Sequence, residues 1–251
     1  MHFELFHHAA STCSQKVRLC LAEKGVTDWV SRVVDLAGNE HLSPGYLRDV
    51  NANGVVPALR VDGRVIVESS VICEYLDEVC APAGSLTPAD PVSRAQMRAW
   101  LRYVDEVPSM AIRVPSFQQW FLPKFQRMTA AEYSDFKRAN PLRRPFMARF
   151  DRLSGFSAED QEIAAWQLRQ SFERMASALA GSPWLCGDTY GIADICTLPT
   201  LVRLEDLRMT RLLDGLPLVR DWYKRAVARP SYAVAYYAGS RTGNAHLEVT
   251  C

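Results

Sequence analysis

A cluster of small hydroxyl and thiol side chains follows the first apolar segment of the chain. Ser11, Cys13 and Ser14 lie between residues 3–6, which alternate like a strand, and a helix predicted over 14–24. The start of a helix has free backbone N–H groups and about half a positive charge, which stabilise an anion and especially a thiolate. The cluster therefore predicts a site for an ionised sulfur. A capping serine and a packed thiol would give the same pattern, so both interpretations stay open.

A proline precedes an alternating apolar segment in the middle of the first third. Pro57 follows Val56 and has no N–H group, so it belongs at a strand start or a sheet edge. If the Val56–Pro57 bond is cis, the turn presents the Val56 N–H and C=O to a bound peptide. The alternative is a proline that only begins a strand.

An acidic and hydroxyl pair opens the next predicted helix. Glu68 and Ser69 follow the segment 64–67 and bring a carboxylate, a hydroxyl and helix-terminal N–H groups together. This set suits an amino acid, because Ser69 and the helix end can take its carboxylate while Glu68 takes its ammonium group. A simple capping arrangement would have the same sequence.

The overall composition excludes several classes of function. Lys and Arg number 29 against 28 Asp and Glu, so no bulk charge attracts nucleic acid. No apolar run is long enough to span a bilayer, and the N-terminus lacks the zones of a signal peptide, so we expect a cytoplasmic protein. The seven cysteines contain no C-x-x-C pair, which predicts reduced thiols and no metal site.

The order of predicted elements indicates two parts. Strands over 3–6 and 30–36, a hairpin over 55–67 with an Asp-Gly turn, and helices over 14–24 and 69–79 predict an α/β domain with a four-stranded mixed sheet over 1–80. Residues 81–90 form a Pro-rich linker. The rest, 91–251, is predicted to be all-helical, with helices over 91–113, 130–139, 158–180, 191–206 and 216–228.

Two segments of the helical part lack a regular pattern. Residues 140–156 are basic, aromatic and broken by prolines, which predicts an extension without a long helix. This extension is either an ordered surface segment or a wall over a pocket between the domains. Residues 239–251 have the composition of a loose tail.

Taken together and in this order, the three motifs resemble the glutathione transferases. The resemblance covers nearly the whole chain and is carried by residues 55–59, 68–76 and 187–195. Gly191 stands where the family usually has a Ser or Thr cap, and residues 51–54 replace its usual Asn-Pro loop. The resemblance implies a thioredoxin-like domain, glutathione as co-substrate, and a homodimer or a heterodimer with a paralogue.

The same resemblance assigns roles to single residues. Val56 and Pro57 would hold the cysteinyl backbone of glutathione, Glu68 and Ser69 its γ-glutamyl end, and His41 its glycine carboxylate. An aromatic substrate would lie between the domains, against candidate wall residues that are equally compatible with a core: His7, Phe117, Trp120, Phe121 and Phe146.

Within the family, the chain is similar to the bacterial β-aryl etherases of lignin catabolism and their fungal-type relatives. The likeness includes residues 67–76, 88–91 and 94–98 and the extension 140–156. It implies that glutathione thiolate displaces a phenol from the carbon beside a ketone and forms a thioether, with Ser14 as the preferred thiolate partner and Ser11 as the other. The loop 11–16 also resembles reductive dehalogenases, in which Cys13 would exchange thiols. A third possibility is a catalytically silent binding or partner subunit.

Overall fold

A four-stranded mixed sheet forms the N-terminal part of the chain in the computed structural model, which describes residues 1–242. Its strands are β1 (Phe3–His7), β2 (Val30–Val33), β3 (Ala58–Val61) and β4 (Arg64–Val67), in the spatial order β2-β1-β3-β4. β1 pairs in parallel with β2 and antiparallel with β3, and β3 pairs antiparallel with β4. The predicted four-stranded mixed sheet is confirmed.

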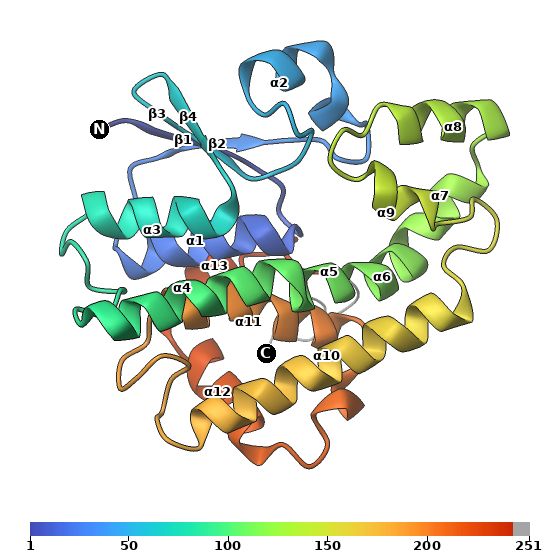
Figure 1. Ribbon diagram of the computed structural model, residues 1–251. Helices are drawn as coiled ribbons and strands as arrows, with labels where there is room; N and C mark the ends of the chain where they lie inside the picture. The colour runs from blue at the N-terminus through green and yellow to red at the C-terminus, as the bar shows by residue number, and fades with distance from the viewer. Residues whose placement is uncertain (243–251) are drawn as a thin grey trace.

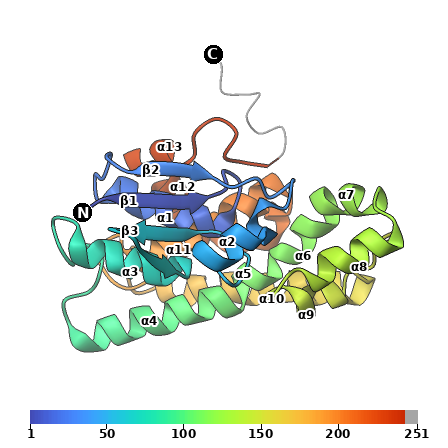
Figure 2. The same ribbon diagram turned by 90° about the horizontal axis from the view of Figure 1, so that it is seen from above.

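Helices cover both faces of this sheet. In Figures 1 and 2, α1 (Thr12–Glu23) and α3 (Ser69–Val79) lie between the sheet and the helical part, and α2 (Pro44–Asp49) lies on the other side, after the short η1 (Glu40–Leu42). The tight turn between β3 and β4 has positive φ at both Asp62 and Gly63, as a primed hairpin turn requires. Helix α1 begins two residues earlier than predicted, and β2 ends three residues earlier.

The strand register brings three loops to one end of the sheet. Phe6 pairs with Ala58, and Ala58 pairs with Val67. The residues after β1, before β3 and after β4 therefore lie next to one another. The same end receives the loop after β2, because Val34 N–H donates to the carbonyl of His7 at 2.8 Å.

The rest of the described chain is helical. Its elements are α4 (Pro91–Glu106), α5 (Pro108–Ala111), α6 (Arg113–Ser116), η2 (Phe117–Phe121), α7 (Leu122–Gln126), α8 (Ala130–Arg138), α9 (Arg144–Ala148), α10 (Ala158–Leu179), α11 (Ile192–Asp206), η3 (Thr210–Leu213), α12 (Pro217–Val227) and α13 (Pro230–Ala235). The prediction of one helix over 91–113 is wrong at its end. Pro108 lacks an N–H group and breaks the helix, which restarts as α5 and α6.

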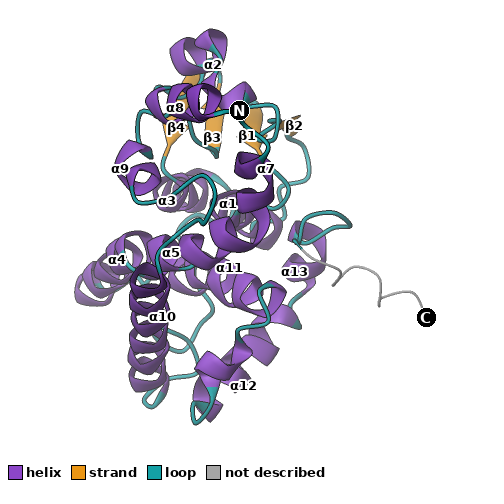
Figure 3. Ribbon diagram, turned by 90° about the vertical axis from the view of Figure 1, so that its right-hand side faces the viewer, coloured by secondary structure: helices purple, strands orange, loops and turns teal. Residues whose placement is uncertain are grey.

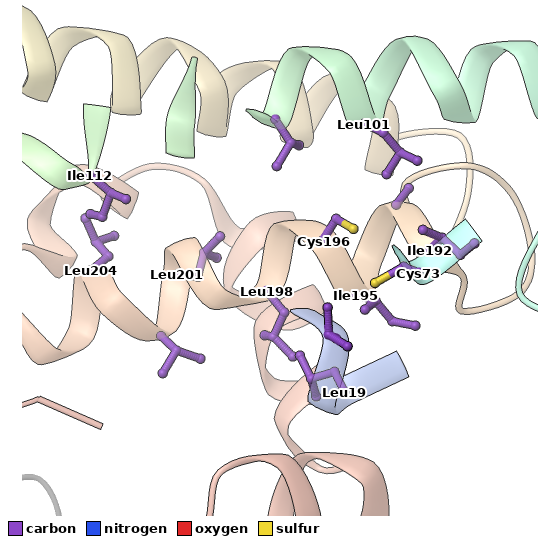
Figure 4. Close-up of a cluster of buried hydrophobic side chains, with 14 of the residues drawn as sticks. Leu19, Cys73, Leu101, Ile112, Ile192, Ile195, Cys196, Leu198, Leu201 and Leu204 are labelled. Atoms are coloured by element: carbon purple, nitrogen blue, oxygen red, sulfur yellow. The ribbon is translucent and has the colours of Figure 1, made fainter. Parts of the chain in front are cut away.

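Helix α11 is the centre of the core. Every residue of α11 except Glu205 is buried. Figure 4 shows its apolar side chains, including Leu198, packed between Leu19 of α1, Cys73 of α3 and Leu101 of α4. One cluster of buried side chains thus joins the sheet's helices to the helical part.

The segment from α7 to α9 leaves the helical bundle and reaches the level of the sheet and α2 (Figures 1 and 3). Lys124 Nζ of α7 donates to the carbonyl of Ala37 at 2.8 Å and to Asn39 Oδ1 at 3.1 Å. The extension 140–156 contains only the short helix α9 and a tight bridge between Asp151 and Gly155.

The predicted tail over 239–251 needs a correction at its first residues. Ser240 is fully buried, and its carbonyl accepts a hydrogen bond from Gln15 Nε2 at 2.8 Å. Ser240 is therefore packed against α1, and Arg241 and Thr242 donate to Asp206 of α11. Residues 243–251 lie outside the described part of the chain.

Candidate functional site

The predicted sulfur site lies at the first turn of α1. Ser11 is the N-cap, and its hydroxyl oxygen accepts from the Ser14 N–H at 3.3 Å. The Ser11 and Cys13 side chains are partly exposed, but Ser14 is fully buried and its hydroxyl oxygen accepts from the His8 N–H at 3.3 Å. This burial counts against the preference for Ser14 as the partner of a bound sulfur and favours Ser11.

Two arginines hold the loop that leads into α1. Arg18 donates to the carbonyls of His8 at 3.3 Å and Ala9 at 2.7 Å, and Arg203 of α11 donates to the carbonyl of Ala10. Because three successive carbonyls are turned toward these guanidinium groups, the loop keeps its course into the helix N-terminus. The sequence did not predict this role for either arginine. Arg203 lies nearly 200 residues from the loop in the sequence.

Cys13 lies near cations of α1, α6 and α11 and near Arg143 at the N-cap of α9. Burial lowers the pKa of Arg113, Arg143 and Arg203, and an ionised Cys13 opposes part of this lowering. Burial alone would also lower the pKa of Lys16, but the charge of Asp105 raises it above its ordinary value. Such a setting suits an anionic ligand at this end of α1.

The Val56–Pro57 peptide bond is cis. Val56 is buried, and within residues 1–242 neither its N–H nor its carbonyl has a hydrogen-bond partner. Tyr46 and Asn51 donate instead to the carbonyl of Val55, at 2.8 and 3.0 Å. The free main-chain groups of Val56 suit an extended peptide paired antiparallel to them.

Glu68 is in a strained backbone conformation directly before α3. Its φ of 69° lies in the left-handed region, which costs a residue other than glycine about 1–3 kcal/mol. Its side chain is exposed, and Ser69 follows as a buried first residue of the helix. Strain of this kind gathers at ligand sites. Ser70 has a structural role, because it donates to Asp105, which also pairs with Lys16.

A recess lies between the loop after β2 and the segment from η2 to α9. Its cavity volume is small, about 30 Å³, and the space around it amounts to about 380 Å³ only when the adjoining open solvent is included. Its wall is mostly aromatic and apolar, with cationic and polar groups at intervals, and is formed by Leu36, His41, Phe117, Phe121, Lys124, Phe136, Asn140, Arg143 and Met147. This composition suits an aromatic ligand with a polar or charged end.

His41 lines this recess from η1. It is 4% exposed, and its Nδ1 is buried without a hydrogen-bond partner. Burial, followed by the charges of Arg143 and Lys124, lowers the pKa of His41 to about 4. The imidazole is therefore neutral at neutral pH and has one free nitrogen for a ligand.

The five aromatic candidates have different positions. Phe117 and Phe121 line the recess with ring centroids 4.4 Å apart, and Phe146 packs on Phe117 from behind at 5.0 Å. Trp120 is partly buried, with the Arg203 guanidinium 5.1 Å from its ring.

His7 does not line the recess. It is 1% exposed, with Nε2 at 2.8 Å from Ser31 Oγ and Nδ1 at 3.3 Å from Arg18. Its ring also meets that of Trp29. These contacts occupy both ring nitrogens inside the sheet domain, so the prediction of His7 as a substrate wall is wrong.

The sequence did not predict Arg113 and Arg143 as residues of this region. Arg143 lies in the basic extension, whose charge was the only signal for it, and Arg113 begins the short helix α6. Their approach to Cys13 depends on the path of the chain through η2 and α7, which no local pattern specifies.

Within residues 1–242, no group of His, Cys, Asp and Glu side chains is arranged to hold a metal ion. The same residues contain no helix long and apolar enough to cross a membrane.

Known proteins match both parts of the chain. Residues 10–79 match the model of the glutathione S-transferase N-terminal domain, and residues 136–230 match that of the C-terminal domain. Tetrachloro-p-hydroquinone reductive dehalogenase of Sphingobium chlorophenolicum is 30% identical over 244 residues, 92% of this chain and 94% of that protein. Maleylacetoacetate isomerase of Pseudomonas aeruginosa is 30% identical over 240 residues, 94% and 96% of the two chains.

A further relative, LigF of Sphingobium sp. strain SYK-6, is 31% identical over 198 residues, 78% of this chain and 76% of LigF. The crystal structure of the β-etherase LigF superposes with a TM-score of 0.82 at 29% identity and covers 94% of this chain and 99% of that one. The two domain matches and these full-length relatives show that the chain belongs to the glutathione transferase family, whose co-substrate is glutathione.

Proposed function

We propose that this protein is a β-etherase-type glutathione transferase acting on aryl ethers derived from lignin. The glutathione thiolate attacks the carbon beside a ketone, so that a C–S bond forms while the C–O bond to the phenol breaks. The phenolate leaves with the electron pair of that bond and takes a proton from solvent. The adjacent ketone activates the carbon, so the protein mainly positions the two reactants and excludes water.

The observation that carries this proposal is the likeness to the β-etherase LigF over nearly the whole chain. The recess adds chemical support, because Phe117 and Phe121 offer stacked rings to an aromatic substrate. These features are consistent with a small aromatic substrate in a pocket between the two domains.

In this proposal, each motif holds one part of glutathione. The free main-chain groups of Val56, next to Pro57, pair with the cysteinyl unit. Glu68 and Ser69 hold the γ-glutamyl end, and the free Nδ1 of His41 donates to the glycine carboxylate. The sulfur then lies at the first turn of α1, where the Ser11 hydroxyl and helix N–H groups donate to it.

The test is incubation with glutathione and a racemic β-aryl ether ketone, followed by chiral separation of the remaining substrate. We expect one equivalent of phenol and one of glutathione thioether for each substrate consumed, with preference for one enantiomer. Glutathione binding without turnover, alone or with a paralogue, would instead identify a silent binding or partner subunit. The homodimer or heterodimer and the cytoplasmic location remain predictions.

A second candidate function is reductive dehalogenation by thiol exchange at Cys13. The observation that favours it is the partly exposed Cys13 thiol at the start of α1, surrounded by cationic groups. Glutathione would first displace halide from the keto tautomer of a halogenated hydroquinone, so that a C–S bond forms while the C–halogen bond breaks and the halide leaves with its electron pair. The Cys13 thiolate would then attack the sulfur of the conjugate, forming a mixed disulfide with glutathione and releasing the reduced ring after protonation; a second glutathione would regenerate the thiol.

The variant Cys13→Ser separates the two functions. Ether cleavage should keep most of its rate, because the glutathione thiolate is its nucleophile. Complete loss of activity on aryl ethers, together with mixed disulfide detected by mass spectrometry in the unmodified protein, would establish the exchange chemistry instead.

A further inference from the structure

Two arginines of the helical part lack a counter-ion beside the recess. The Arg143 side chain makes no hydrogen bond or ion pair within residues 1–242, and its Nε is buried without a partner. Arg113 has only the sulfur of Met110, at 3.1 Å, and the ring of Phe146, at 5.7 Å from its centroid. Both side chains are partly buried, and a partly buried charge without a counter-ion is uncommon because losing its hydration is costly.

The two guanidinium groups lie close to each other. Arg143 occupies the N-cap position of α9, and the first turn of α9 carries Phe146, the ring over which the Arg113 guanidinium lies. Burial and the neighbouring charge of Arg113 lower the pKa of Arg143 to about 9. No carboxylate of the described chain contributes to the pKa of either arginine, although several other arginines of the molecule are paired with carboxylates.

The pair also lies near the recess and within electrostatic range of Cys13. Arg143 lines the recess together with Phe117 and His41, and an ionised Cys13 favours the charged form of both arginines. Aromatic side chains and two cations without a carboxylate partner are therefore neighbours at the recess. Guanidinium groups bind carboxylate and phenolate oxygens through charge-assisted hydrogen bonds.

We infer that Arg113 and Arg143 form a binding site for an anionic oxygen on the aromatic ligand, either a carboxylate of the acceptor or the departing phenolate. The inference rests on the proposed function for the aromatic nature of the occupant. The ring stacks against Phe117 and Phe121, and its oxygen takes the place of the missing counter-ion. In the ether cleavage, the same cations stabilise the charge that develops on the leaving oxygen.

The test measures binding without turnover, so that its failure is distinct from failure of the proposed function. Protein saturated with S-methylglutathione is titrated by calorimetry with benzoate, with 2,4-dinitrophenolate and with neutral benzamide. We expect both anions to bind better than benzamide. Tighter binding of benzoate indicates a carboxylate on the acceptor, and tighter binding of dinitrophenolate indicates the leaving group.

The variants Arg113→Gln and Arg143→Gln should each weaken binding of the anions about tenfold or more and leave benzamide binding unchanged. Arg144→Gln is the matched control, because it removes the same charge from an exposed position one residue away. The melting temperature should not fall in either variant, since neither guanidinium group has an ion-pair partner to lose within residues 1–242. Arg113→Lys and Arg143→Lys keep the charge but lose the planar guanidinium group. They should weaken anion binding less than the Gln variants do.

Three results would overturn the inference. The first is unchanged anion binding in both Gln variants. The second is an equal loss of anion binding in Arg144→Gln, because this would indicate only long-range electrostatic attraction. The third is that Arg113→Gln and Arg143→Gln weaken the binding of glutathione itself, or raise the pKa of its bound thiol, and leave the binding of the aromatic anions unchanged. The counter-ion would then be supplied by glutathione.

Discussion

At the first turn of α1, two serines that are three residues apart face different surroundings. Ser11 is the partly exposed cap, whereas Ser14 is buried and accepts from the His8 N–H. A hydroxyl can stabilise a thiolate only where the sulfur can reach it. The accessible hydroxyl, not the one inside the helix, is therefore expected to determine the acidity of bound glutathione.

Replacing Ser11 with alanine should lower turnover by about 10- to 100-fold, because a hydrogen bond to a charged group contributes about 1.5–3 kcal/mol. Glutathione affinity should change much less, since Val56, Glu68 and Ser69 are untouched. The measurements are steady-state rates and the ultraviolet titration of the bound thiol. Ser11→Gly controls for the lost cap, as glycine is a tolerated cap residue. A larger rate loss in Ser14→Ala than in Ser11→Ala would restore Ser14 as the thiolate partner.

His7 gives a prediction about pH and stability. Burial, followed by the charges of Arg18 and His8, lowers the pKa of His7 to about 4. Between pH 6.5 and 4 the unfolded chain therefore binds more protons than the folded one, so stability is complete above pH 6.5 and falls as the pH is lowered. The contribution of His7 is about 3 kcal/mol over this interval at about 1.4 kcal/mol per pH unit.

Urea unfolding at pH 7 and pH 4.5 checks this, with His7→Gln as the comparison. The variant should lose less stability than the unmodified protein over the interval. The stability that the variant still loses includes the contribution of His41, because burial also lowers the pKa of His41. Identical pH dependence in the two proteins would contradict the assignment.

Among the elements, α11 depends on a buried carboxylate at its first turn. Asp194 is 1% exposed and accepts from Trp222 Nε1 at 2.7 Å and from the N–H groups of Leu185 and Gly191, each at 3.1 Å. Burial raises the pKa of Asp194 to about 6, against the lowering effect of these donors. Gly191 has no side chain, so Asp194 alone provides the side-chain part of the cap. The carboxylate thus fixes α11 to the loop before it and to α12.

Replacing Asp194 with alanine should cost about 3 kcal/mol or more, because three buried N–H groups lose their acceptor. Asp90→Ala is the matched control, since Asp90 caps α4 at an exposed position and its loss should cost about 1 kcal/mol. Chemical unfolding of both variants gives the comparison. Equal costs would mean that the buried cap contributes no more than a surface one.

Across the whole molecule, one core joins the two parts. Leu198 of α11 is fully buried near Leu19 of α1, as Figure 4 shows. Further links fix the C-terminal helix to the sheet domain, because Arg229 pairs with Glu23 at 2.7 Å and Arg18 donates to the carbonyl of Ala235 at 3.0 Å. The two parts should therefore unfold together.

The variant Leu198→Ala should lower the free energy of unfolding by about 2–5 kcal/mol through the lost contacts and the cavity. Tryptophan fluorescence and far-ultraviolet circular dichroism should still report one transition, shifted to lower denaturant. Leu153→Ala, at a position that is 59% exposed, should change stability by less than about 0.5 kcal/mol. Two separate transitions in Leu198→Ala would show that the parts are only loosely coupled.

The sequence by itself determined the elements and the motifs for which we propose glutathione binding. Strand alternation, the Asp-Gly turn and the small residues before α1 act through local backbone chemistry, so their pattern predicted the mixed sheet and the helical part. Local rules also explain the wrong prediction of one helix over 91–113. Pro108 breaks this helix, but the apolar pattern continues past it and favoured a single helix.

Only the tertiary structure decided which of these side chains are buried and which stay accessible. The burial of Ser14 and His7 depends on the loop over 8–10, whose carbonyls are held by Arg18 and by Arg203 from α11. The unpaired Arg113 and Arg143 meet beside Cys13 because the segment from η2 to α9 folds back to the sheet. The approach of Arg203 to this loop, and of Arg113 and Arg143 to Cys13, joins residues about 100 to 200 positions apart. No periodicity or cap specifies packing over that separation.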